Sequence, residues 1–599
     1  MIAKLVFIGV HFAGLLVFVM ACFGLGMIVF RRVIDALRSE HWLRFGLTVT
    51  FGLGVVILAL QLFAIMGVLT VKEVITLITV GCFFAIVQWR QISLPCPSWR
   101  SLLFWEKIAL LMLTAALLRT LLAPFHPSSV FDEVMYHLPH ALRWKEAGRL
   151  TVNMWLRYPW FPFNYELLYS AALLIYDDIF AHLLHALAGW LCVLLIFQVC
   201  LKFTTDRVLA SIAAVIWLVL TAEEFDGAYI DMGVALFVLG AAVAMWLWWE
   251  SEQTQFAWII GSFFLLGVAA GAKYQALTFI PIFVGAMLVR DRRLRVIGLA
   301  LPVLMIPCLY WYARNALMTG DPFDPLGGPL FGFSDWNIGD YQYQIRDLHS
   351  HAARLPWLLW PAFIVPMLSE VWRSKRWRLA MGFGGYSILV WYVMTGGYVR
   401  YLIPALPVLS VIAARGWGWL LGTVRDDLFC DRLIFAGMNA RSQLFLNDEW
   451  KSRFHRMMFF LCIIVFAGIS LPSMRTSWRE IAVTKAEREA YLSSHIPGYN
   501  VLTYLKRLPD VHAYQFGLED AIYYAPQPIW GDWFGPGRYR DFCNLSAQRL
   551  AYNLTEMGLN TLIVHHARWP MITAKPEFSK YFELIIENQG VSAYRIKAR

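Results

Sequence analysis

Two adjacent carboxylates, Asp132 and Glu133, stand in the stretch "SSVFDEVMYHLPHALRW", which follows the apolar run "IALLMLTAALLRTLLAPF". Tyr136 and His137 come directly behind them. A carboxylate in a partly dry site can act as a general base, and a neighbouring one can tune its pKa or hold a substrate hydroxyl. The pair therefore predicts proton-transfer chemistry, and the simpler alternative is that both acids solvate the end of a loop.

The histidines of this stretch suggest a second kind of chemistry. His137 and His140 are three positions apart, so a helix would place both on one side, where Asp132 could complete a three-ligand metal site. The alternative is hydrogen bonding within the loop. The rest of the sequence has no Cys/His metal spacing. We predict no cofactor, and a divalent metal held by these three residues stays open as the alternative.

The elements that must position these residues are apolar. Of the 599 residues, 59% are hydrophobic and only 15% are charged, and the mean hydropathy is +0.56. Soluble domains have roughly 45–50% apolar residues. Apolar runs long enough to cross a hydrocarbon core as helices recur from the first residues to about position 472. The composition therefore predicts an integral membrane protein.

About fourteen membrane-spanning helices are expected, and the positive charges orient them. The expected centres lie near residues 16, 56, 80, 113, 190, 214, 240, 264, 282, 304, 363, 387, 411 and 464. With the N-terminus outside, most basic residues fall in inside loops. The net charge of +10 then reports orientation, so no nucleic-acid partner is predicted. Asp132 and Glu133 fall on the outer face, in a long loop over residues 125–180.

The C-terminal part differs in composition from the rest. From about residue 480 the chain is of mixed polarity, and "VHAYQF", "TLIVHH" and "FELIIE" have the pattern of strands. Between the first two, "LSAQRLAYNLTEMGL" has helical spacing, and Gly558 would end that helix. This pattern predicts a small α/β domain outside the membrane.

Five motifs carry a resemblance to a known family. They are "FDEVMYHLPHALRW", "AYIDMGVALF", "GVAAGAKYQAL", "WYARNALMTGDPFDPLG" and "RYLIPALPVLSVIAARG". In this order they resemble the polytopic GT-C glycosyltransferases, which include protein O-mannosyltransferases and the bacterial enzyme that adds aminoarabinose to lipid A. The resemblance implies additional N-terminal transmembrane helices over 1–102, a GT-C transmembrane catalytic core over 103–475 and a soluble periplasmic α/β domain over 476–599.

The resemblance also implies an activity. A GT-C enzyme of this type moves a sugar from a polyprenyl-phosphate carrier to an acceptor at the outer face, with inversion at the anomeric carbon. Asp132 matches the family's catalytic carboxylate and would take the proton from the acceptor nucleophile. Glu133 completes a pair like that of the mannosyltransferases. Asp231 would orient the acceptor or close the site opposite Asp132, unless it is there because the helix dipole favours an acid at a helix N-terminus.

A phosphate leaving group needs cations near the membrane surface. Lys273, Arg314 and Arg400 are predicted at the outer ends of spans, where the positive-inside bias makes basic residues uncommon. Snorkelling of long basic side chains is the alternative explanation. The predicted substrate-binding residues are completed by Tyr136 and His137, and by Tyr274 and Tyr401, which follow Lys273 and Arg400 directly.

Two functions of other classes compete with the enzyme. A transporter or flippase of lipid-linked sugars would place ionisable residues deep within spans, whereas here they cluster at span ends. A non-catalytic membrane assembly protein would tolerate loss of the outer carboxylates. The partners expected for the enzyme are a polyprenyl-phosphate-linked sugar, the lipid bilayer and an acceptor lipid, polysaccharide or protein. The expected location is the bacterial inner membrane, with the active site and the C-terminal domain on the periplasmic side.

Overall fold

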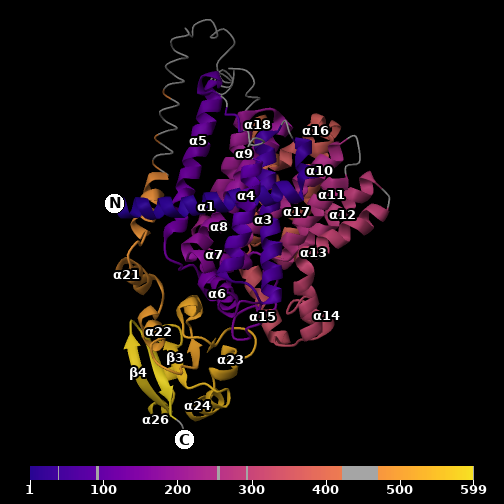
Figure 1. Ribbon diagram of the computed structural model, residues 1–599. Helices are drawn as coiled ribbons and strands as arrows, with labels where there is room; N and C mark the ends of the chain where they lie inside the picture. Colours follow the sequence, from indigo (N-terminus) through magenta and orange to yellow (C-terminus); the bar gives the residue numbers. More distant parts are fainter. Residues whose placement is uncertain are drawn as a thin grey trace, which may run out of the picture.

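Long helices make up most of the molecule, and a small sheet domain lies at its C-terminal end (Figure 1). The computed structural model describes residues 1–37, 40–88, 94–96, 98–251, 256–291, 294–420, 457, 464, 468 and 470–597. The prediction of an α-helical, multi-pass membrane protein with a small C-terminal α/β domain is confirmed.

Seven helical segments within the described ranges are long and apolar enough to cross a membrane. They are Ile2–Val29, His41–Met66, Phe104–Phe125, Asp178–Thr204, Asp231–Glu250, Val296–Thr319 and Val399–Leu420. Shorter apolar helices accompany them, at Glu166–Ile175, Arg207–Leu220, Phe256–Ala270, Tyr274–Arg290 and Trp357–Met367. The expected spans near residues 80 and 387 are also helical, and the one expected near 464 lies outside the continuously described ranges.

Helices make up most of the membrane part in the described ranges. In chain order they are α1 (Ile2–Val29), α2 (Arg31–Ile34), α3 (His41–Met66), α4 (Val71–Val87), α5 (Phe104–Leu121), α6 (Leu138–Ala147), α7 (Glu166–Ile175), α8 (Asp178–Thr204), α9 (Arg207–Leu220), α10 (Asp231–Glu250), α11 (Phe256–Ala270), α12 (Ile280–Arg290), α13 (Leu294–Thr319), α14 (Gly328–Phe331), α15 (Ile338–Ser350), α16 (Ser369–Arg373), α17 (Lys375–Thr395) and α18 (Leu406–Leu420).

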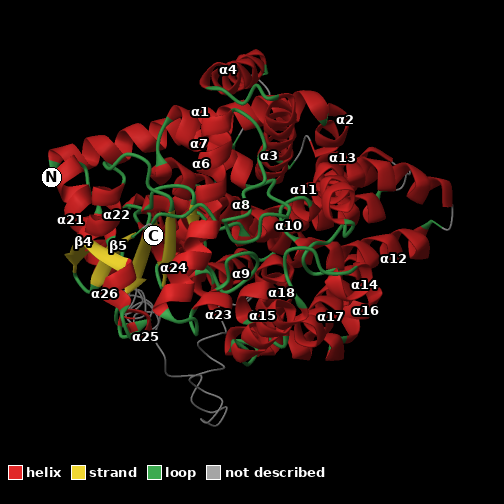
Figure 2. Ribbon diagram, turned by 90° about the horizontal axis from the view of Figure 1, so that it is seen from below, coloured by secondary structure: helices red, strands yellow, loops and turns green. Residues whose placement is uncertain are grey.

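The first long helices are joined through small residues. A Cβ atom on Gly24 of α1 would overlap the backbone of Gly81 in α4, and one on Gly52 of α3 would overlap the backbone of Cys22 in α1. Close backbone approach at small residues is a common way to pack helices in membranes, where apolar burial between helices adds little. α4 lies at the edge of the molecule in the second view (Figure 2).

The C-terminal domain is built around a five-stranded sheet with the order β2-β1-β3-β5-β4. Its strands are β1 (Ala513–Phe516), β2 (Ile529–Trp530), β3 (Thr561–His565), β4 (Phe582–Asn588) and β5 (Val591–Ile596). Its helices are α21 (Lys485–His495), α22 (Tyr499–Leu505), α23 (Tyr539–Phe542), α24 (Ala547–Glu556), α25 (Pro570–Thr573) and α26 (Phe578–Tyr581). The three predicted strands and the predicted helix are present as β1, β3, β4 and α24, whereas β2 and β5 were not predicted.

The chain segment between α5 and α8 packs against both the membrane helices and the C-terminal domain. It contains a π-helical turn, η5 (Glu133–His137), followed by α6 and α7. A proline in the first turn favours the start of α6, and Gly148 in the left-handed conformation ends it. Val134 and Leu156 of this segment are buried in one apolar cluster of the C-terminal domain. The predicted outer loop is therefore packed against that domain.

Candidate active site

A cavity of about 990 Å³ lies where the helices meet the C-terminal domain. This volume is at the upper end of the range of ligand sites, roughly 300–1,000 Å³. Its wall includes parts of η5, α15, α17 and the domain loop over 531–540. It also includes seven of the residues predicted from the sequence, namely Asp132, Tyr136, His137, Lys273, Tyr274, Arg400 and Tyr401.

Two acids and two bases form one network at this cavity. The Nε atom of Arg400 donates to Oδ2 of Asp231 at 2.8 Å, and its Nη1 donates to Oδ2 of Asp132. Lys273 donates from Nζ to Oδ1 of Asp231 at 2.5 Å. Arg400 therefore bridges the two carboxylates. The Asp231 side chain is fully buried, and it does not itself line the cavity.

Aromatic rings hold both basic side chains. The Lys273 ammonium lies 4.6 Å from the ring centroid of Tyr401, and the Arg400 guanidinium lies 4.6 Å from that of Tyr229. Such cation–π contacts strengthen when water is excluded. Burial lowers the pKa of Lys273, but the charge and hydrogen bond of Asp231, together with Tyr401, outweigh burial and raise the pKa above its ordinary value. Lys273 therefore stays protonated and can meet an anion.

Asp132 is held in its ionised form. Burial alone would raise the pKa of its carboxyl group, but the surrounding charges, that of Arg400 first, and the hydrogen bond of Arg400 together outweigh burial and hold the pKa below its ordinary value. The carboxylate can thus accept a proton at neutral pH. Loss of contact with Arg400 would make it more basic, because the favourable charge would be removed.

Glu133 points away from Asp132. It is absent from the cavity wall and is fully buried, where its Oε1 pairs with Nε2 of His182. His182 also lies 3.1 Å from the hydroxyl of Ser128. Ser128 N donates to Asp178, which is paired with Arg488 of α21. Neighbouring side chains leave a helical turn in different directions, so the adjacent acids enter different environments, and Glu133 belongs to a network that holds the loop to α8 and the C-terminal domain.

The two histidines do not assemble the metal site that was considered. His137 lines the cavity, and its Nδ1 lies 2.7 Å from Glu166 Oε1. Burial lowers the pKa of His137 to about 3, so the ring is neutral. His140 is bonded to the carbonyl oxygen of Arg157 at 3.0 Å, outside the cavity wall. Among the described residues, no group of three or more His, Cys, Asp and Glu is placed to hold a metal ion.

Arg314 lies outside the cavity wall. Its Nε and Nη2 donate to Asn315 Oδ1 at 3.0 and 2.8 Å, and its guanidinium lies 5.4 and 5.0 Å from the ring centroids of Trp160 and Trp311. Asn315 in turn donates to the Tyr274 hydroxyl at 2.9 Å. Arg314 is thus part of the support behind Tyr274, and the structure does not bring it to Lys273 and Arg400.

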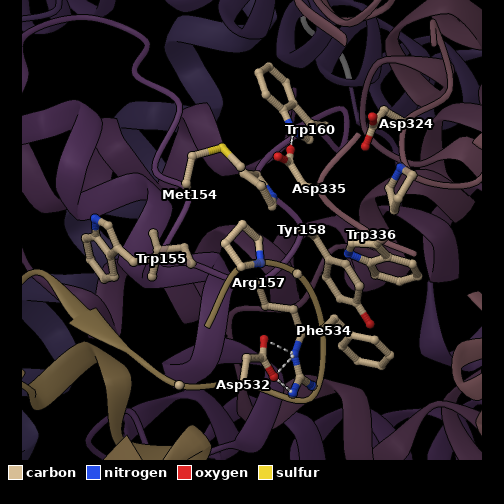
Figure 3. A pocket seen from close by; sticks show the side chains of 16 residues that line it. Met154, Trp155, Arg157, Tyr158, Trp160, Asp324, Asp335, Trp336, Asp532 and Phe534 are labelled. Carbon is tan, nitrogen blue, oxygen red and sulfur yellow. Dashed lines mark hydrogen bonds and ion pairs between the residues drawn. The ribbon is translucent and has the colours of Figure 1, made fainter. Parts of the chain in front are cut away.

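The structure adds residues that sequence reasoning did not select. Arg157 from the loop before α7 pairs with Asp532 of the C-terminal domain, with Nε donating at 2.9 and 3.1 Å (Figure 3). Phe534 stacks on Trp336 at 4.7 Å between ring centroids. The aromatic and basic stretch "GDWFGPGRYRDF", which contains Asp532 and Phe534, is the sequence signal for them, but nothing local in the sequence identifies their contacts.

The turn between α9 and α10 contains two carboxyl groups with buried oxygens, and these predict a pH effect. Among the described residues, Glu224 Oε2 and Asp226 Oδ1 are buried without hydrogen-bond partners. Burial raises the pKa of each to about 7. A folded-state pKa above the unfolded one gives stability that is present at low pH and lost as pH rises through about 7. The melting temperature should therefore fall as the pH rises from about 4.5 to about 7.

Glu224→Gln should reduce that fall, because the amide does not ionise as the pH rises from about 4.5 to about 7. The measurement is thermal unfolding of the purified chain in detergent at a series of pH values. Glu223→Gln is the matched control, since Glu223 is exposed in the same turn, and its curve should run parallel to that of the native chain. Parallel curves for native chain and Glu224→Gln would contradict the prediction.

Comparison with known proteins adds two kinds of similarity. The uncharacterized protein SF2092/S2214 of Shigella flexneri is 44% identical over 43 residues, which are 7% of this chain and 24% of that protein. The chain thus spans about a quarter of the curated relative that it matches. Residues 487–595 match the family model SF2091/S2213.

The chain is also similar to solved structures. ArnT from Cupriavidus metallidurans bound to undecaprenyl phosphate has a TM-score of 0.47 and 16% identity, with 81% of this chain and 97% of that chain covered. The archaeal oligosaccharyltransferase AglB from Archaeoglobus fulgidus, in complex with an inhibitory peptide and a dolichol-phosphate, has a TM-score of 0.46 and 12% identity, with 82% and 74% covered.

One family model covers more than half of the sequence. It matches residues 10–352, which include the first long helices, the π-helical turn with Asp132, and the segments that supply Asp231 and Lys273. Its description is "Domain of unknown function (DUF8201)". On this match, the chain belongs to the DUF8201 family.

Proposed function

We propose that the chain is an inverting glycosyltransferase that moves a sugar from a polyprenyl-phosphate carrier to an acceptor, with Asp132 as the general base. The active site and the C-terminal domain would face the periplasm of a bacterial inner membrane, and the divisions of the chain near residues 102 and 475 belong to the same proposal. The support comes from the motifs that resemble GT-C enzymes and from the arrangement of the cavity.

One observation carries the proposal. Asp132, Lys273 and Arg400 meet in the wall of one cavity, although they come from distant parts of the chain. A proton acceptor therefore shares one cavity wall with two cations that can bind a phosphate. Glycosyl transfer from a phosphate carrier needs both, because a proton leaves the nucleophile while negative charge grows on the phosphate.

The apolar part of the same wall suits a lipid carrier. Leu277 and Phe279, at the start of the α12 region, and Val390, Trp391 and Met394 of α17 line the cavity. These residues belong to or adjoin helices of the membrane part. An isoprenoid chain buried along this wall would place its phosphate near the charged network, because the same cavity contains both regions.

The reaction follows from these positions. The acceptor heteroatom attacks the anomeric carbon and forms the new glycosidic bond, while its proton moves to the Asp132 carboxylate. The bond between the anomeric carbon and the phosphate oxygen breaks, and its electron pair stays on the polyprenyl phosphate. Lys273 and Arg400 bind the phosphate oxygens as this charge develops. Attack opposite the leaving group inverts the anomeric configuration.

Arg400 also links donor binding to base strength. In the structure it contacts Asp132 and Asp231. When a donor phosphate shares its guanidinium, Asp132 loses part of its counter-charge and becomes a stronger base. The same step leaves Asp231 paired with Lys273. The base would thus be activated when the donor is present.

The test is transfer of labelled sugar from a panel of polyprenyl-phosphate donors to total envelope extract, with the purified chain in proteoliposomes. Label that moves from the carrier to an extract component is the expected result. If the chain binds a labelled donor but all of the label stays on the carrier, the proposal is wrong and transport of lipid-linked sugars takes its place. Movement of the intact donor between leaflets would then be measured directly.

A further inference from the structure

The loop over 531–540 of the C-terminal domain is fixed against the membrane part by charge. Asp532 pairs with Arg157, and both side chains are largely buried. Asp340 of α15 has a fully buried side chain and pairs with Arg538, whose Nη1 donates at 2.5 Å, and with Arg540. Ion pairs that are buried and bidentate hold their geometry better than exposed ones. The loop is therefore held in a defined position at the cavity.

Aromatic packing fixes the same loop. Phe534 is only 7% exposed and lies between Trp336 and the loop before α7, with its ring nearly parallel to that of Trp336, at 11° (Figure 3). The narrow crevice drawn there is lined by residues from separate chain segments, among them Tyr158, Asp335 and Asp532. Phe534 is an anchor, and its burial accounts for the aromatic residue at that position.

Burial does not account for Trp533, the residue next to Phe534. Trp533 is 40% exposed, and Tyr343 of α15 is 36% exposed. Both line the cavity, and their rings are almost parallel, at 6° with 5.6 Å between centroids. Large apolar surfaces left open in a cavity wall usually contact a ligand. Two separate chain segments thus present adjoining ring surfaces to the cavity.

The surroundings of the two rings restrict the ligand. Gln344 and Asp347 line the same part of the cavity, and Asp347 is one helical turn from Tyr343 on α15. A pyranose ring offers apolar C–H faces for the aromatic rings and hydroxyl groups at its edge for the amide and carboxylate. An isoprenoid chain has no such edge, and its place is the apolar wall on α17.

A series of contacts joins this part of the cavity to the proposed base. Tyr136, four residues after Asp132, meets Tyr158 edge to face at 5.2 Å between centroids. Tyr158 donates from its hydroxyl to Gln344 Oε1 at 3.0 Å. All of these side chains line the one cavity. An extended acceptor could therefore bind at Tyr343 and reach Asp132 with its nucleophile.

We infer that Trp533 and Tyr343 form an acceptor subsite for the pyranose rings of a glycan, an inference that rests on the proposed function for the identity of the bound molecule as acceptor. The C-terminal domain then selects the acceptor by supplying half of the subsite, while the membrane helices bind the donor. The acceptor class is thereby a glycan chain, free or attached to a lipid.

The test measures binding of a panel of fluorescently labelled pyranose oligosaccharides to the purified full-length chain in nanodiscs, by equilibrium anisotropy. At least one oligosaccharide should bind the native chain, and Trp533→Ala and Tyr343→Ala should each weaken its binding about five- to tenfold. Trp533→Phe keeps a ring and should retain more affinity than Trp533→Ala. Tyr552→Ala is the matched control, because Tyr552 is 63% exposed on α24 and lies outside the cavity wall.

Several results would overturn the subsite. They are the absence of oligosaccharide binding to the native chain, losses in both alanine variants no larger than in Tyr552→Ala, and binding of labelled peptides in place of oligosaccharides. Unchanged binding of a labelled polyprenyl-phosphate sugar shows that the variants remain folded. If the native chain binds glycans but transfers no sugar, the proposed function fails and the subsite stands. If it transfers sugar and the variants bind and use glycans normally, the subsite fails alone.

Discussion

Asp132→Asn should lower the rate of sugar transfer by about 10²–10⁴-fold, the usual cost of losing a general base. Asparagine keeps the size of the side chain but cannot take the proton from the acceptor. The affinity for donor should change much less than the rate, because Lys273 and Arg400 remain to bind the phosphate. The measurement is kcat and KM for labelled donor, since a loss confined to kcat identifies a role in the chemical step.

The neighbouring acid provides the control for this variant. Glu133→Gln changes a carboxylate of the same π-helical turn, but Glu133 faces His182 and not the cavity. Its effect should appear mainly as lower thermal stability, because His182 loses a buried charged partner. Equal transfer rates for native chain and Asp132→Asn would show that another group is the base.

Replacement of Arg400 should have the largest effect on stability. Arg400→Leu removes the contact that Asp132 and Asp231 share. Breaking a buried ion pair by removing one partner costs about 3–5 kcal/mol. We expect the lower end, about 3 kcal/mol, because Asp132 keeps some access to water and Asp231 keeps Lys273. Denaturant unfolding of the purified chain at pH 7 measures the difference, and a variant as stable as the native chain would contradict it.

The pH dependence of this loss has a defined sign. Arg400 holds the pKa of Asp132 below its ordinary value, so the stability from this contact is present above the unfolded pKa and is lost as pH falls through the folded one. The gap between native chain and Arg400→Leu should therefore narrow in acid. The free energy of unfolding of Arg400→Lys should lie between those of the native chain and Arg400→Leu. An ammonium group restores the charge but cannot bridge two carboxylates with a planar fork.

Much of the architecture could be predicted from local sequence patterns. Apolar runs predicted the long helices, short apolar runs predicted β1, β3 and β4, and helical spacing predicted α24. These features depend on neighbours within one or two turns, so composition and spacing contain most of the information. β2 has only two residues, which is too short for a period to appear, and it exists because β1 is beside it.

The sequence by itself determined which residues can carry the chemistry, since Asp132, Lys273 and Arg400 stand out by residue type at the ends of apolar runs. Only the tertiary structure decided their partners. Arg400 reaches Asp132 across 268 positions, and Arg157 reaches Asp532 across 375. Likewise, the π-helical turn directs the Glu133 side chain away from the cavity and toward His182. Local propensity does not specify such pairs, because they arise from the packing of helices and domain that brings distant charges into one low-dielectric space.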